Sequence, residues 1–157
     1  MSDQNIISYC NELTKLGIEN RILEHPTLKA KIDVLNYLQL DASDCVPTLI
    51  MKADNKFIAV VIRGDCKIDF KKVKKEFGIE NLRMATPDEF TNLTHLPIGA
   101  ARIYTPEVNM TIIDNKVFEK DFLAGGSGSF TYSINYKTSD LRKLPKSVTA
   151  DISQLVS

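Results

Sequence analysis

The chain has 157 residues, of which 43% are hydrophobic and 25% charged, a composition typical of one folded domain with a single core. Twenty basic and twenty acidic side chains give a net charge of zero, which argues against a general nucleic-acid coating role but not against a local basic patch. Neither a signal peptide nor the ~18-residue apolar run of a membrane span is visible. We therefore expect a soluble, cytoplasmic protein with one domain over residues 1–157 and no membrane or DNA partner.

Cysteine and histidine residues are too few and too widely spaced to suggest a metal site. Cys10, Cys45 and Cys66 form no C-x-x-C pair, and the chain has two histidines, His25 and His95. An odd and sparse set of cysteines fits a reducing cytosol better than a disulfide framework. The sequence therefore predicts neither a zinc site nor a cofactor.

The first half of the chain predicts two helices, a short strand and a β-hairpin. Apolar residues recur at helical spacing from Ile6 to Leu16, and Gly17 follows as a natural stop. A short strand is expected at 21–24, and a second helix begins a few residues after Thr27. Strands at 48–52 and 57–63 flank a polar turn, and the second is apolar on both faces, which indicates burial on both sides.

The second half predicts two capped helices and two further strands. Asp69 and Gly78 have the positions of an N-cap and a C-terminal stop, and Thr86-Pro87-Asp88-Glu89 combines a capping box with proline at the first helical position. Strands are expected at 110–113 and 130–137, the latter half exposed because apolar and polar residues alternate. A short helix follows at 139 or 140, and the tail after Pro145 has weak signals. Hairpins outnumber plausible parallel crossovers, which favours a mixed or antiparallel α+β sheet over a doubly wound fold.

Two segments of small residues are candidate ligand-binding features. Residues 123–129 contain three glycines, whose backbone N–H groups could form a nest for a phosphate or carboxylate oxygen. Residues 96–101 contain Gly99, which could let a ligand approach the backbone closely. On composition alone, a flexible hairpin loop and an ordinary turn explain these segments better.

Charged and nucleophilic side chains allow two readings each. The lysines that follow Asp69 could bind phosphate groups, the main source of nucleic-acid affinity, or could simply form a solvated helix face. The thiol of Cys66 lies among charged residues that could lower its pKa, but nothing in the sequence places a histidine beside it. No serine-hydrolase, zincin or Walker motif is present. These residues by themselves predict an α+β domain with two glycine-bearing loops.

The order of several short segments resembles the YbaK/ProX family of aminoacyl-tRNA editing domains. The resemblance runs from about residue 5 to about residue 144, nearly the whole chain. Each segment is modest alone, but their order and spacing together are fairly specific. The segments are Glu24-His25-Pro26-Thr27, Pro47-Thr48-Leu49-Ile50-Met51, residues 63–72, residues 82–87, Ile98-Gly99-Ala100, Ile113-Asp114 and Ala124-Gly125-Gly126.

This resemblance implies both a fold and an activity. The fold is a compact α/β domain around a mixed, mostly antiparallel and partly closed sheet flanked by helices. The activity is hydrolysis of the ester of mischarged tRNA in trans or in cis, with aminoacyl-tRNA as substrate and, for some members, a synthetase as partner. Such a second hydrolytic site is chemically reasonable, because a synthetase pocket cannot firmly reject a slightly smaller or isosteric amino acid.

By the same resemblance, backbone groups carry most of the chemistry. Those of Gly99, Gly125 and Gly126 position the ester and stabilise charge, while water or, in some members, the substrate's own thiol attacks. Other positions are expected to border the substrate: His25, Pro47, Thr48, Ala100, Ala124, Ser127 and Thr131. The lysines expected to contact acceptor-stem phosphates are Lys71, Lys72 and Lys74.

Three positions depart from the family pattern. YbaK-type members carry a lysine just before Thr-Leu, where this chain has Pro47, and some members carry a serine and an acid at the positions of Ala124 and Thr131. Strand alternation turns Lys52 away from the face of position 47. Lys29 or Lys31, from the lead-in to the second helix, could reach in instead. These departures leave a second reading open, a non-catalytic module that binds aminoacyl-tRNA or a synthetase. A third reading is a thiol hydrolase that uses Cys66.

Overall fold

The computed structural model describes residues 3–156 and distributes their strands over three sheets. The largest sheet has the order β5-β2-β3-β6-β9, in which β2 is antiparallel to β3 and β5 while β3, β6 and β9 run parallel. Its strands are β2 (Thr48–Ala53), β3 (Lys56–Val61), β5 (Leu82–Met84), β6 (Thr111–Asp114) and β9 (Ser147–Ala150). Most strand pairs of the chain are antiparallel, so the expected mixed, mostly antiparallel α/β fold is confirmed.

Two smaller antiparallel sheets complete the strand structure. One has the order β1-β8-β7 and consists of β1 (Asn20–Glu24), β8 (Tyr132–Lys137) and β7 (Phe122–Gly126). The other pairs β10 (Ser153–Leu155) with β4 (Cys66–Ile68). An isolated bridge between Cys45 and Ala124 joins the chain just before β2 to β7. The two larger sheets therefore meet at this bridge as open sheets, rather than forming one partly closed sheet.

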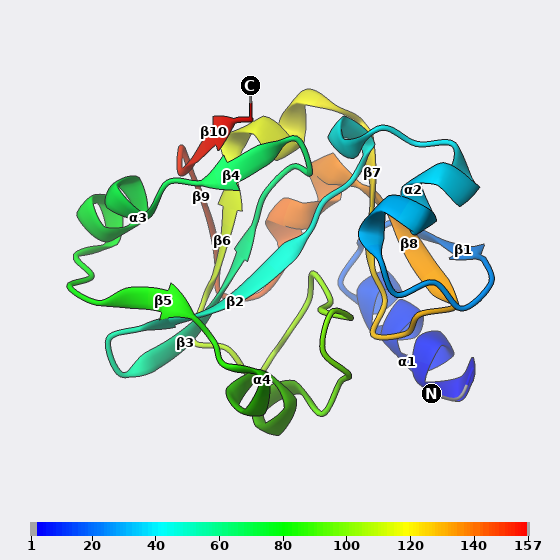
Figure 1. The fold of residues 1–157 in the computed structure, drawn as a ribbon, viewed down its shortest axis with the longest axis horizontal. Helices are drawn as coiled ribbons and strands as arrows, with labels where there is room; N and C mark the ends of the chain where they lie inside the picture. The colour runs from blue at the N-terminus through cyan, green and yellow to red at the C-terminus, as the bar shows by residue number, and fades with distance from the viewer. Residues whose placement is uncertain (1–2, 157) are drawn as a thin grey trace.

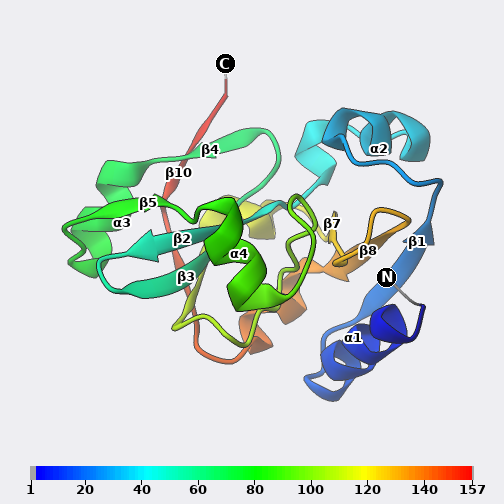
Figure 2. The same cartoon turned by 60° about the horizontal axis from the view of Figure 1, so that its bottom comes forward.

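Helices lie at the two ends of the molecule and along one side of the large sheet. Figures 1 and 2 show α3 beside β4 and β5 at one end, and α1 and α2 at the opposite end beside the three-stranded sheet. The α-helices are α1 (Asp3–Lys15), α2 (Lys31–Leu38), α3 (Phe70–Phe77) and α4 (Pro87–Thr94), and the 3₁₀ helices are η1 (Ala42–Asp44), η2 (Asn115–Glu119) and η3 (Thr138–Lys143). Within residues 3–156, no helix is long and apolar enough to span a bilayer.

Local sequence signals set the ends of α3 and α4 as expected. The carboxylate of Asp69 accepts a hydrogen bond from the backbone N–H of Lys72, and Gly78 ends α3 with a φ of 64°. At α4, the Thr86 hydroxyl and the Glu89 carboxylate each accept from the other residue's backbone N–H. These bonds fix the residues at which the two helices begin.

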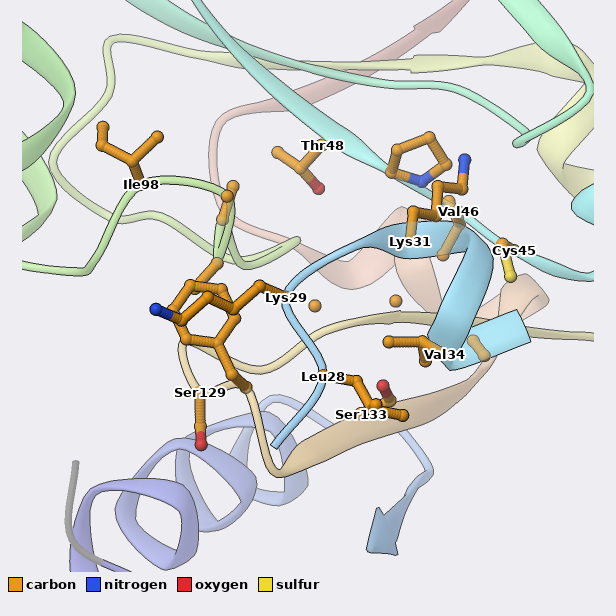
Figure 3. Close-up of a pocket in the computed structure, with 18 of the residues that line it drawn as sticks. Leu28, Lys29, Lys31, Val34, Cys45, Val46, Thr48, Ile98, Ser129 and Ser133 are labelled. Carbon is orange, nitrogen blue, oxygen red and sulfur yellow. The ribbon is translucent and has the colours of Figure 1, made fainter. Parts of the chain in front are cut away.

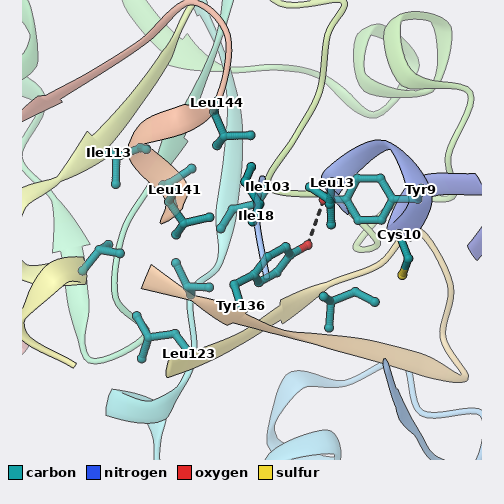
Figure 4. Packing of buried hydrophobic residues seen from close by; sticks show 14 of the residues in the cluster. Tyr9, Cys10, Leu13, Ile18, Ile103, Ile113, Leu123, Tyr136, Leu141 and Leu144 are labelled. Atoms are coloured by element: carbon teal, nitrogen blue, oxygen red, sulfur yellow. Dashed lines mark hydrogen bonds between the residues drawn. The ribbon is translucent and has the colours of Figure 1, made fainter. Parts of the chain in front are cut away.

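Strand β3 is buried on both faces, as its apolar sequence predicted. Ile58 and Val60 pack with Val73 of α3 on one side, whereas Ala59 packs with Phe90 of α4 on the other. A separate cluster joins α1 to β6, β7 and β8. Figure 4 shows its centre, where Tyr136 is surrounded by apolar side chains and its hydroxyl lies 2.8 Å from that of Tyr9.

Several strands were absent from the sequence-based expectation. These are β4, β5, β7, β9 and β10, and most are only three or four residues long. The most consequential case is β7, because Gly125 and Gly126 lie in a strand and not in the loop expected at 123–129. Glycine weakens a strand in isolation, but pairing with β8 over five residues compensates here. The loop proper is confined to residues 127–131.

Candidate functional site

The two segments of small residues border the same cavity. Its volume is about 380 Å³, a size that suits a small organic ligand. Gly99 and Ala100 line it from one segment, and Ala124, Gly125 and Gly126 line it from β7. Further walls come from residues 25–40, the chain from Cys45 to Ile50, residues 84–90 and residues 129–133. Figure 3 shows several of these residues around the cavity.

Close backbone approach explains why glycine occupies this wall. A Cβ atom on Gly126 would overlap the carbonyl oxygen of Ala101, and one on Gly125 would lie 3.0 Å from the carbonyl oxygen of Val46. Gly99 has a φ of +89°, a conformation that side chains rarely adopt. The glycines therefore bring three backbone segments together at the cavity.

Apolar side chains form the buried floor of the cavity. Leu35, Cys45, Val46, Ile50 and Phe90 line it and are each less than 10% exposed. Burial raises the pKa of the Cys45 thiol to about 11, even though the neighbouring Lys31 ammonium acts in the opposite direction. The floor is thus uncharged and suited to an apolar group.

Among the described residues, the only formally charged side chains that line the cavity lie at its mouth. Lys29 and Lys31 line it, no Asp or Glu does, and exposed Met84 and Ile98 form part of the rim. The Lys29 ammonium lies 5.8 Å from the centre of the Phe130 ring, and the Lys31 ammonium lies beside Gly64. An incoming ligand therefore meets a positive rim before an apolar interior.

The start of β2 contributes one hydroxyl and no charge to the cavity. Pro47 directly precedes the strand, so its missing N–H removes no bond from the ladder, and its carbonyl accepts from the Ile62 N–H at 3.2 Å. Thr48 projects from β2 toward the cavity (Figure 3), and its hydroxyl has no hydrogen-bond partner within residues 3–156. Lys52 does not line the cavity and lies 4.0 Å from the Glu89 carboxylate. This agrees with the expected strand alternation.

His25 and Ser133 form a hydrogen-bonded pair at the cavity. His25 Nε2 lies 3.0 Å from Ser133 Oγ, and His25 Nδ1 lies 2.9 Å from the carbonyl oxygen of Pro26. Both residues are buried and line the cavity. The sequence analysis missed Ser133, although its place on the polar face of the alternating 130–137 strand was visible. That face proves to border the cavity at Ser133 instead of open solvent.

Two of the expected substrate-binding residues lie outside the cavity lining. Ser127 is fully buried and its hydroxyl donates to the carbonyl oxygen of Tyr132 at 2.5 Å. The Thr131 hydroxyl pairs with that of Ser129 at 3.0 Å. Both side chains shape the 127–131 loop, so any influence on a ligand in the cavity acts through the loop backbone.

The expected phosphate-binding lysines also lie away from the cavity. Lys71, Lys72 and Lys74 belong to α3, at the end of the molecule opposite α2 and β7 (Figure 1), and Lys72 pairs with Asp151 at 3.2 Å. Cys66 lies in β4, does not line the cavity, and has its thiol pKa raised chiefly by burial. This position gives no support to a thiol hydrolase at the cavity. No cluster of three or more potential metal ligands occurs among residues 3–156.

Comparison with known sequences identifies a family model and several relatives that match this chain. Residues 25–144 match the model of the aminoacyl-tRNA editing domain. The proline–tRNA ligase of Staphylococcus epidermidis is 32% identical over 126 residues, which cover 79% of this chain and 21% of the ligase. The ligase of Caldicellulosiruptor saccharolyticus is 28% identical over 121 residues, or 74% of this chain and 20% of that enzyme. This chain spans about a fifth of the length of these curated relatives.

Solved structures share the fold at lower sequence identity. The hypothetical protein APE2540 superposes with a TM-score of 0.84 at 22% identity, covering 95% of this chain and 99% of that one. A proposed trans-editing enzyme for prolyl-tRNA synthetase gives a TM-score of 0.80 at 17% identity, covering 96% and 97% of the two chains. At these identities the likeness concerns the fold alone.

Proposed function

The chain belongs to the aminoacyl-tRNA editing domain family, and from this membership we propose that it hydrolyses the ester bond of mischarged tRNA in trans. The observation that carries the proposal is the shared cavity, in which Gly99 and the Gly125–Gly126 pair face one space with an apolar floor. Such a space would hold the aminoacyl group while the RNA strand leaves through the positive rim. The relatives named as proline–tRNA ligases make a synthetase a reasonable partner.

Catalysis in this proposal depends on positioning. Backbone N–H groups of the small-residue segments stabilise the oxyanion that forms when water attacks the ester carbonyl. The bond from the carbonyl carbon to the ribose oxygen then breaks, and the ribose oxygen leaves with a proton from the attacking water. Holding water and ester in one small cavity supplies much of the rate enhancement. The cavity mouth offers Lys29 and Lys31 for the ammonium role that Pro47 cannot fill. Contact of Lys71, Lys72 and Lys74 with more distant tRNA phosphates stays a prediction.

A panel of mischarged tRNAs tests the activity directly. The protein, at micromolar concentration, is incubated with tRNAs that carry small or apolar amino acids, and release of the amino acid is measured. We expect hydrolysis of at least one member well above the spontaneous rate. If every ester is as stable with the protein as without it, the proposal is wrong.

A second candidate function is suggested by Pro47, which leaves no charged group at the start of β2. In this reading the protein binds aminoacyl-tRNA or a synthetase without turnover. Pro47→Lys distinguishes the two readings, with Pro47→Ala as the control that removes proline without adding charge. We expect the native protein and Pro47→Ala both to be active. Activity that arises only in Pro47→Lys would instead favour the binding module.

A further inference from the structure

The His25–Ser133 pair has a defined hydrogen-bond direction. His25 Nδ1 faces the carbonyl oxygen of Pro26, which can only accept, so Nδ1 carries the proton in the neutral ring. Nε2 is then an acceptor, and the Ser133 hydroxyl must donate to it. The single proton of Ser133 is thereby committed, and both lone pairs of its oxygen are available to a ligand. No other hydrogen bond to Ser133 Oγ occurs within residues 3–156.

Ser133 lies next to the glycine wall of the cavity. It is the cross-strand partner of Gly126, so its side chain emerges on the same face of the sheet as that glycine. The same face of Gly126 meets Ala101 of the other small-residue segment. An ester carbonyl that reaches Gly126 from the cavity would therefore place its α-carbon substituents beside the Ser133 hydroxyl.

The α-amino group of an aminoacyl ester requires an acceptor in this cavity. Whether protonated or neutral, it has N–H bonds to donate, and leaving them unpaired on burial is unfavourable. Asp and Glu are absent from the described lining residues, and the two charged side chains at the mouth are lysines. Neutral oxygens must serve instead, and Ser133 is the buried hydroxyl that His25 fixes as an acceptor.

We infer that Ser133, oriented by His25, accepts a hydrogen bond from the free α-amino group, so that the cavity selects esters of α-amino acids over acyl esters that lack the α-amino group. This inference rests on the proposed function for the identity of the ligand. Ser133 contacts the substrate and determines specificity. His25 is a positioning residue that acts through Ser133.

Stable amide analogues of the substrate test this inference by binding alone, without any need for catalysis. The alanyl, valyl and leucyl amides of 3′-amino-3′-deoxyadenosine are titrated by calorimetry. Their counterparts without the α-amino group, the propanoyl, 3-methylbutanoyl and 4-methylpentanoyl amides, are titrated in the same way. For at least one pair, we expect the free amine to bind about tenfold more tightly, the ratio that one such hydrogen bond supports. Ser133→Ala should reduce that preference below about threefold. Ser139→Ala, an exposed serine of η3 outside the cavity, should leave it unchanged.

Variants of His25 test its positioning role by the same measurement, the ratio of the affinities within each pair of analogues. The amide oxygen of His25→Gln can replace Nε2 as the acceptor for Ser133 and should keep the preference, whereas His25→Ala should lower it. Circular dichroism identifies any variant that fails to fold. The inference is overturned if the native protein binds both members of every pair equally, or binds none of them. It is also overturned if folded Ser133→Ala keeps the preference of the native protein. A clear preference without deacylation of any tRNA would defeat the proposed activity and leave the inference standing.

Discussion

Gly126 is the residue at which two walls of the cavity touch. Its Cα faces the carbonyl oxygen of Ala101 so closely that no side chain fits, and strand pairing sets it opposite Ser133. Gly78 differs, since it lies at the end of α3 with a φ of +64° and no heavy atom near its missing Cβ. The two glycines therefore serve different purposes, close contact at one and backbone conformation at the other.

We expect Gly126→Ala to push the two small-residue segments apart. Overpacking of this kind costs about 1–3 kcal/mol of unfolding free energy, and any deacylase activity should fall with it. Gly78→Ala is the control, because its left-handed conformation costs about 1–2 kcal/mol without touching the cavity. Urea denaturation and the deacylation rate are measured for both variants. Equal activity in the two would show that contact at Gly126 does not matter for function.

At the scale of elements, α4 connects local capping to the cavity wall. Phe90 from this helix lines the floor, and Pro87 from its first turn lines the rim. Glu89 closes the capping box and also pairs with Arg83 of β5 at 2.7 Å. The Arg83 guanidinium, followed by the backbone N–H of Thr86, lowers the pKa of Glu89 to about 2.

This lowered pKa makes the contribution of Glu89 to stability depend on pH. Because the folded-state value lies below the usual 4.5, the stabilisation is present above pH 4.5 and is lost as pH falls from there toward 2. Glu89→Gln should therefore lower the thermal midpoint at pH 7 and differ less from the native protein near pH 2. Asp88→Asn removes a carboxylate from the same turn but keeps the capping box, and should change the midpoint less. A constant difference between Glu89→Gln and native protein at all pH values would contradict this account.

At the scale of the whole molecule, a chain of hydrogen bonds ties α1 to the cavity. The Tyr104 N–H donates to the Tyr9 hydroxyl, and the Tyr136 hydroxyl donates to the carbonyl oxygen of Gly126 at 3.1 Å, so Tyr9 must donate to Tyr136. Burial raises the pKa of Tyr9 to about 12 and also holds that of Tyr136 well above its usual value, so both phenols stay protonated at neutral pH. The amino-terminal helix is thereby coupled to β7 across the core.

Removal of either hydroxyl should destabilise the protein by more than its own bond is worth. Tyr9→Phe and Tyr136→Phe each leave a buried partner unsatisfied, which costs about 1–3 kcal/mol. The double variant should lose less unfolding free energy than the sum of the two single losses, because it contains no hydroxyl that has lost its partner. Urea denaturation of the four proteins in this cycle measures the coupling. Strict additivity would mean that the two hydroxyls act independently.

The sequence by itself determined the features that depend on residues close together along the chain. The caps at Asp69 and Thr86, the hairpin turn after Ala53 and the buried character of β3 all follow from short-range patterns, and each is present in the structure. Family resemblance added a substrate-binding role for the two small-residue segments, and the structure places both at one cavity. Such signals are reliable because capping and alternation involve atoms only a few residues apart.

Only the tertiary structure decided how distant segments meet. Strand β7 contains two glycines and forms because β8 pairs with it, and the short β9 and β10 form against β6 and β4. The pair of His25 and Ser133 joins residues 108 positions apart, and neither the hydrogen bond nor its direction has a local signature. Long-range pairing and close backbone contact decide these features, because the energy that stabilises each of them comes from a partner elsewhere in the chain.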